Sequence, residues 1–86
     1  MSNPVSLLRL PATLAASGHR RSTFYAGIKR GEIPPPVKIG ERAAAWPAHE
    51  IEAVNRARMA GAGSTELRAL VARLLKERAE CAKRRA

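Results

Sequence analysis

The 86-residue chain contains no aspartate, a single cysteine and three aromatic residues. Because Cys81 is alone, no intramolecular disulfide can form, as is usual for proteins of a reducing cytoplasm. His19 and His49 have no aspartate or second cysteine to join them, so neither a metal site nor a cofactor is expected. The sequence also lacks a phosphate-cradling glycine loop and a nucleophile beside a base, which argues against an enzyme. Scarce aromatics disfavour binding of single-stranded RNA by base stacking.

Long apolar runs are also missing. A membrane-spanning helix needs about 20 consecutive apolar residues, and no segment approaches that length. The apolar N-terminal residues are not preceded by positive charge and are interrupted by Arg9 and Pro11, unlike a signal peptide. The expectation is therefore a soluble, cytoplasmic protein.

Positive charge is what the chain has in excess. Sixteen Lys and Arg residues face seven glutamates, which gives a formal net charge of +9 and a sequence pI near 11.4. The cations occur in both halves of the chain, so they do not form a single basic tail. Such a balance indicates a negatively charged partner, with nucleic acid ahead of an anionic membrane surface.

A first short helix is predicted over residues 11–17. Pro11 suits the first position of a helix, where its missing N–H is not needed, and Gly18 tolerates the left-handed conformation that ends one. The inner side of this helix would carry Leu14 and Ala15. Only about three residues precede the next helical pattern, and such a short connection is typical of a helix-turn-helix.

The second predicted helix, residues 21–30, has a cationic outer face and ends at Gly31. Steps of 100° per residue turn Phe24 and Ile28 toward the core. The outward residues are then Ser22, Ala26 and Lys29, flanked by Thr23, Tyr25 and Arg30. A solvated surface is one interpretation of this face. Contact with DNA is the favoured one, because Lys and Arg neutralise phosphates and hydroxyls bond phosphate or base edges.

Three prolines at 34–36 end the helical pattern and favour an extended path. Residues 37–40 and 43–46 then form two predicted strands joined by a turn, which beside a helix-turn-helix make a wing. Trp46 and Ile39 are expected in the core, with Trp46 filling the space between the wing and a helix.

Two further helices are predicted. Pro47 opens the third, which buries Ile51 and Val54 and ends in the glycine-rich residues 61–63. Ser64 is the expected N-cap of the fourth, with Glu66 in its first turn. This helix repeats apolar residues with helical spacing at Leu67, Leu70, Val71, Leu74 and Leu75.

This division suggests a DNA-binding domain over residues 1–60 and a basic amphipathic helix over residues 64–86. The apolar stripe of the fourth helix has two interpretations. It packs onto its own domain, or it pairs with a second chain to make a homodimer, as small DNA-binding domains commonly do.

The stretch "RSTFYAGIKRGEIPPPVKIGERAAAWPAHEIEA" resembles the AlpA-type prophage regulators, and the likeness extends over about residues 7–58. The resemblance implies a winged helix-turn-helix related to MerR-type regulators and phage excisionases, with its second helix in the major groove of double-stranded DNA. It also implies that the arginine of the wing approaches the DNA backbone or minor groove. Together with the basic cluster, it selects as DNA-binding residues Arg20, Arg21, Ser22, Thr23, Tyr25, Lys29, Arg30, Lys38 and Arg42.

The chain departs from that family at two places. His19 and Arg20 stand where an apolar residue and a serine are more usual, so the ordinary N-cap of the second helix is missing. Gly27 replaces a bulkier residue and is expected to cost the helix about 0.5–1 kcal/mol relative to alanine.

The sequence thus predicts a mainly α winged helix-turn-helix protein that binds specific DNA and regulates prophage or mobile-element genes, acting on RNA polymerase. An excisionase-type factor that bends DNA for an integrase is the alternative. A second alternative is a protein-interaction or membrane-surface module built on residues 64–86.

Overall fold

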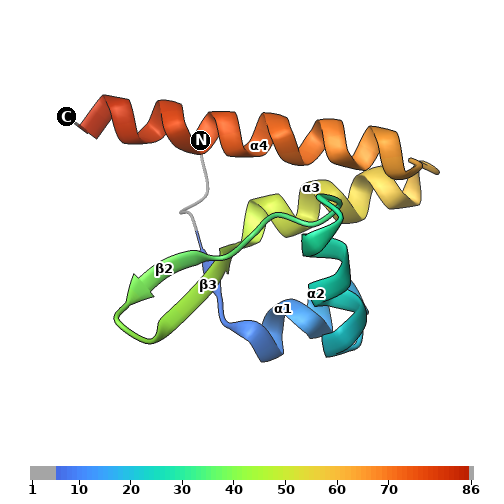
Figure 1. The fold of residues 1–86 in the computed structure, drawn as a ribbon, viewed down its shortest axis with the longest axis horizontal. Coiled ribbons are helices and arrows are strands. Elements are labelled where there is room, and N and C mark those ends of the chain that lie inside the picture. The colour runs from blue at the N-terminus through green and yellow to red at the C-terminus, as the bar shows by residue number, and fades with distance from the viewer. Residues whose placement is uncertain (1–5, 86) are drawn as a thin grey trace.

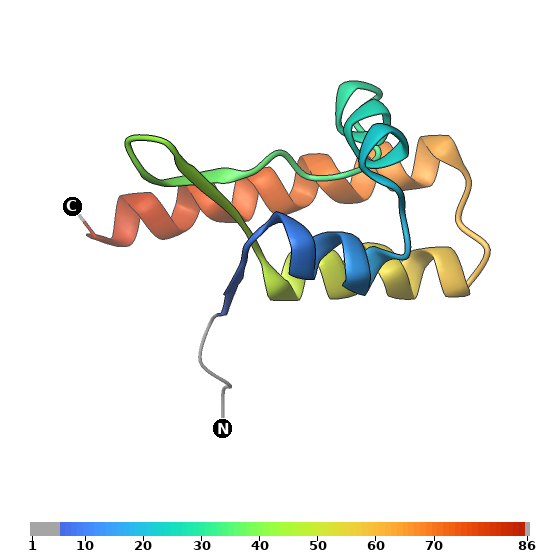
Figure 2. The same cartoon turned by 90° about the horizontal axis from the view of Figure 1, so that it is seen from below.

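The computed structural model describes residues 6–85, which form four helices and three short strands. In chain order these are β1 (Leu7–Leu8), α1 (Leu10–Ser17), α2 (Arg21–Lys29), β2 (Val37–Gly40), β3 (Ala43–Pro47), α3 (Ala48–Met59) and α4 (Ser64–Arg85). Figure 1 shows α4 lying along α3, with α1 and the β2–β3 hairpin on the other side of α3. In Figure 2 the hairpin and α2 lie at opposite ends of that side, with α1 between them. The fold is a mainly α winged helix-turn-helix with an added C-terminal helix.

The helix-turn-helix consists of α1 and α2, and both helices agree with the prediction to within a residue. Gly18 ends α1 with a φ of 74°, and its N–H donates to the Leu14 carbonyl at 2.9 Å. The predicted inner side of α1 is partly wrong, because Ala15 is exposed and Thr13 is fully buried. Burial of Thr13 is tolerated because its hydroxyl donates to the Arg9 carbonyl at 2.9 Å.

The core of the winged helix-turn-helix is built around Phe24 and Trp46. Their rings meet edge to face with centroids 5.3 Å apart, a favourable aromatic arrangement. Ile33 and Ile51 complete the buried cluster. The indole N–H of Trp46 donates to the Pro34 carbonyl at 3.0 Å, so the one polar atom of this side chain is satisfied. The prediction of Trp46 as a core residue is confirmed.

The sheet has one strand more than the sequence predicted. The two-residue β1 pairs antiparallel with β3, so that the order is β1-β3-β2. The prediction that Ile39 belongs to the core is wrong, because 44% of this residue is exposed. The pairing register shifts between Lys38 and Gly40, which leaves Ile39 as an extra residue on β2. Such a bulge bends the strand and re-aims its side chains, which strand alternation alone does not reveal.

The apolar stripe of α4 packs against α3 of its own chain. Leu67, Val71 and Leu74 are buried, and two of them, Leu67 and Leu74, form a cluster with Val54 of α3. Leu75, at the edge of the predicted stripe, is 36% exposed. The predicted N-cap is displaced by one residue, because the Gly63 carbonyl accepts the first helical hydrogen bond and α4 begins at Ser64.

Gly27 is buried on the inner side of α2, beneath Ile33. A Cβ atom built at this position would lie 2.5 Å from Ile33 Cδ1 and 3.0 Å from Cγ1. Ile33 is itself only 3% exposed, so it has little room to move aside. The residue that helix propensity marks as a weakness is therefore what permits close packing between α2 and the segment after it.

We predict that Gly27→Ala destabilises the protein although alanine is the better helix former. Overpacking of a buried site costs about 1–3 kcal/mol, which exceeds the 0.5–1 kcal/mol that helix propensity returns. Thermal unfolding should show a lower Tm for the variant. Adding Ile33→Val removes the clashing methyl group and should restore part of the loss. A Tm above that of the wild type would contradict this packing.

His19 occupies the turn between α1 and α2 and is half-buried. Its ring lies 6.4 Å from that of Phe24, and it shares a small hollow with Asn55 and Arg58 of α3. Burial lowers the pKa of His19 below its ordinary value of 6.5, and the positive charges of Arg58 and Arg30 lower it further. The neutral imidazole is therefore the form that the folded turn favours.

Stability should consequently fall as the pH drops below 6.5, because the unfolded chain then takes up a proton that the folded turn resists. Above that pH the contribution of His19 is fully present. His19→Gln should flatten the pH dependence of urea-unfolding free energies in this window. His49→Gln, at an exposed position, is the matched control. An unchanged slope in the His19 variant would contradict the assignment.

Candidate nucleic-acid interface

All nine residues selected from the sequence are exposed. On and beside α2 these are Arg20, Arg21, Ser22, Thr23, Tyr25, Lys29 and Arg30, and on the wing they are Lys38 and Arg42. Phe24 and Gly27 are buried on the opposite side of α2, and Ile28 is partly buried against the core. The predicted phase of α2 is therefore correct, and its outward face is polar and cationic.

The N-terminus of α2 is open to a ligand. Arg20 occupies the N-cap position in an extended conformation and makes no side-chain capping hydrogen bond. The first hydrogen bond of the helix is donated by the N–H of Phe24 to the Arg20 carbonyl at 2.9 Å, so the amides before Phe24 have no acceptor within the helix. The free amides at the helix start carry partial positive charge and lie beside Arg20 and Arg21. This end of α2 attracts anions.

Tyr25 packs on the core at the edge of α2 and is also exposed. Its ring packs edge to face on Phe24, with centroids 6.0 Å apart, yet 42% of the residue remains exposed. The guanidinium of Arg21 lies over the same ring, 5.9 Å from its centroid. This cation–π contact helps to hold Arg21 against the helix surface.

Arg30 differs from the other arginines and lysines selected from the sequence because its side chain forms an ion pair within the protein. Its Nε lies 3.2 Å from Glu32 Oε2, and Arg68 of α4 lies 3.8 Å from the same oxygen. The hydrogen bond from Arg30 is the main reason why the pKa of Glu32 is lowered, although burial of the carboxylate acts in the opposite direction. Glu32 thus offsets part of the positive charge at the C-terminal end of α2.

Charge is segregated along the chain in a way that suits this surface. No carboxylate side chain occurs before Glu32, so β1, α1 and α2 contribute only cations. One of these is Arg9, exposed at the N-cap of α1, which the sequence reasoning did not select. On the wing, Lys38 and Arg42 flank a single exposed glutamate, Glu41.

The structure does not gather these residues into one cluster. Figures 1 and 2 show the turn of the hairpin and α2 at opposite ends of one side of the molecule, with α1 between them. The cations therefore form two separate groups, one on α2 and one on the wing. An elongated anion could contact both groups at once, whereas a small ligand could not.

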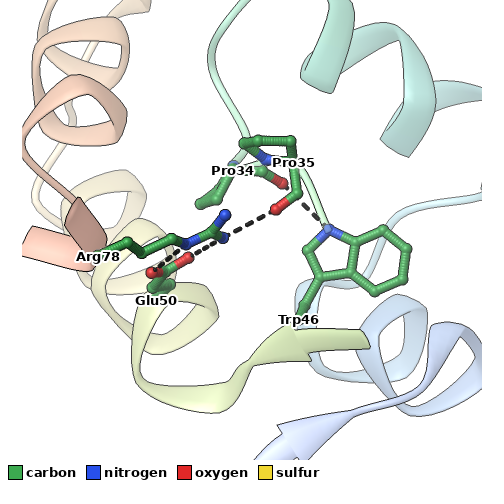
Figure 3. Close-up of polar contacts among 5 residues, drawn as sticks. All are labelled: Pro34, Pro35, Trp46, Glu50 and Arg78. Carbon is green, nitrogen blue, oxygen red and sulfur yellow. Dashed lines mark hydrogen bonds and ion pairs between the residues drawn. The ribbon is translucent and has the colours of Figure 1, made fainter. Parts of the chain in front are cut away.

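A group of buried and partly buried polar contacts lies along the segment between α2 and β2 (Figure 3). Trp46 donates to the Pro34 carbonyl, and Arg78 donates to the Pro35 carbonyl at 2.8 Å. Arg78 also donates from Nε to the buried carboxylate of Glu50 at 2.9 Å, and from a second nitrogen to its other oxygen. No sequence pattern indicated the pair of Glu50 and Arg78, which lie 28 residues apart on different helices.

Two other kinds of site find no support in residues 6–85. No group of three or more His, Cys or carboxylate side chains within this range is placed to hold a metal ion. Over the same range, none of the helices combines the length and the apolar character that crossing a bilayer requires.

Comparison with known proteins agrees with this geometry. Residues 6–56, from β1 into α3, match the family described as prophage CP4-57 regulatory protein (AlpA). Protein ORF88 of Enterobacteria phage P4 is 41% identical over 54 residues, which cover 63% of this chain and 61% of that protein. The chain thus spans about three fifths of the length of this relative. No solved structure matches the chain significantly.

The family match ends before α4 begins, so α4 and its contacts are features that the comparison does not describe. The match nevertheless covers more than half of the chain, including α1, α2 and the wing. The resemblance noted in the sequence is confirmed: this chain belongs to the AlpA family of prophage regulatory proteins.

Proposed function

We propose that this protein is a sequence-specific DNA-binding regulator of prophage or mobile-element genes. The observation that supports the proposal most directly is the outer face of α2, which is exposed, cationic and free of carboxylates over the whole helix. Phosphate neutralisation by Lys and Arg supplies most of the affinity of such surfaces for DNA. Membership of a prophage regulatory family supports the choice of target genes.

In the proposed complex α2 enters the major groove with its N-terminal end foremost. The base-reading residues are then Arg21, Ser22 and Thr23, since recognition helices meet base edges near their N-termini. Arg21 is the strongest candidate, because a guanidinium can form two hydrogen bonds with one guanine. Lys29 would contact a phosphate from a position farther along the helix.

The wing would contact the same duplex at a second place, through Lys38 and Arg42. Gene expression would then change because the bound protein touches RNA polymerase or blocks its access. The wide separation of wing and α2 equally suits an excisionase-type role, in which DNA bent across both groups is presented to an integrase. The two roles differ in where the sites lie, at a promoter or in tandem at an attachment site.

Pairing of two chains is a separate question. Three of the five stripe residues of α4 are buried within this chain, so a homodimer through residues 64–86 would have to use the outer face of α4. Selection of binding sites from random duplexes decides this point together with the target. A palindromic site favours a dimer, whereas a single half-site favours a monomer.

Alanine substitutions should divide the outer face of α2 into two kinds of residue. Arg21→Ala should cost about 1–3 kcal/mol on the selected site and little on random DNA, since it removes a contact with a base. Lys29→Ala should weaken binding to the selected site and to random DNA alike, and it should make the slope of log K against log salt shallower by about 0.9. Competition titrations at two salt concentrations measure both effects. Equal loss on both duplexes for Arg21→Ala would show that Arg21 does not read a base.

A further inference from the structure

The segment that joins α2 to the wing, residues 31–36, is held along most of its length; we call it the connector. Its Glu32 N–H donates to the Gly27 carbonyl at 2.9 Å, which ties its start to α2. Ile33 is buried in the core, and the Pro34 carbonyl accepts the indole N–H of Trp46. The path of the connector therefore decides where β2, and with it the wing, lies relative to α2.

Helix α4 contacts the connector at two places. Near its start, Arg68 approaches Glu32 with a nitrogen-to-oxygen distance of 3.8 Å. Three turns later, Arg78 donates to the Pro35 carbonyl at 2.8 Å. The first contact is half-exposed and worth little on its own, since surface ion pairs contribute at most about 1 kcal/mol. The second is more deeply placed and more specific in geometry.

Arg78 joins the connector to α3 through one guanidinium. Besides the Pro35 carbonyl, it binds both oxygens of Glu50, whose side chain is 1% exposed (Figure 3). Glu50 lies in the first turn of α3, directly after β3. Because the connector leads into β2 and β3 leads into α3, this one side chain fixes the wing at the base of both its strands. Lysine lacks the planar fork that such a double contact needs.

We propose that Arg78 is a positioning residue for DNA binding, which sets the place of the wing relative to α2 without touching DNA. The inference rests on the proposed function, and it extends that function to α4, which lies beyond the residues matched by the family. It follows that residues 64–86 are no detachable appendage, because removing them leaves the buried Glu50 carboxylate without its partner. An unpaired buried charge is strongly destabilising.

The test is a double-mutant cycle between Arg78 and the wing residue Arg42. Affinity for the duplex selected by the wild type is measured over a range of salt concentrations for Arg42→Ala, Arg78→Met and the double variant. Arg78→Lys, which keeps the charge and loses the fork, extends the test if Arg78→Met does not fold. Arg73→Met, at an exposed position on α4, is the control for loss of one positive charge. Arg21→Ala is combined with Arg78→Met as a second cycle.

In the wild-type background Arg42→Ala should make the slope of log K against log salt shallower by about 0.9, the value for one phosphate contact. Arg78→Met should make the slope shallower by a similar amount. Adding Arg42→Ala to the Arg78→Met protein should then change the slope little. Arg73→Met should leave the effect of Arg42→Ala intact, and Arg21→Ala should weaken binding by the same factor in both backgrounds. If Arg78 only stabilised the fold, Arg78→Met would not abolish the effect of Arg42→Ala while leaving that of Arg21→Ala unchanged.

The proposal is overturned if Arg42→Ala has the same effect on affinity and slope in the folded Arg78→Met or Arg78→Lys protein as in the wild type. It is also overturned if the coupling energy between Arg78 and Arg21 equals the coupling energy between Arg78 and Arg42. The wing would then depend on Arg78 no more than α2 does. Failure of the wild type to select any duplex is a different result, and it would overturn the proposed function itself.

Discussion

The arrangement of this small protein depends on Trp46. From β3, its ring packs on Phe24 of the helix-turn-helix, and its N–H binds the carbonyl of Pro34 in the connector. One side chain thereby joins α2, the connector and the wing. A domain of this size buries a modest share of its surface, so few side chains are available to connect several elements in the core. Trp46 thus joins α2 and the connector to the wing on the core side, while Arg78 holds the connector from the side of α4.

Two buried glutamates form ion pairs with arginines of the same chain. Glu50 is almost fully buried and neutralised by Arg78, while Glu32 is held between Arg30 and Arg68. These carboxylates are occupied by internal partners, and none lies in β1, α1 or α2. A surface on which cations outnumber acids in this way keeps a positive field toward solvent, which is what attraction of a polyanion needs.

The sequence was sufficient for the four helices, for the two strands of the wing and for the phase of α2, but not for β1. Gly18 and the prolines mark where helices begin, end and give way to strands, because these residues act through local backbone geometry. The phase of α2 could be predicted because Phe24 and Ile28 recur at helical spacing. Errors arose where neighbours distant in sequence decide, as with the bulge that exposes Ile39 and the buried Thr13.

By itself, the sequence determined the family, the net charge of +9 and the identity of the cationic residues on α2 and the wing. Only the tertiary structure decided how these two groups are spaced. It also showed that the apolar stripe of α4 is directed to α3, and that Gly27 is needed for close approach of Ile33. The pair of Glu50 and Arg78 could not be predicted, since its energy comes from burial and a shared fork geometry, and neither has a local sequence pattern.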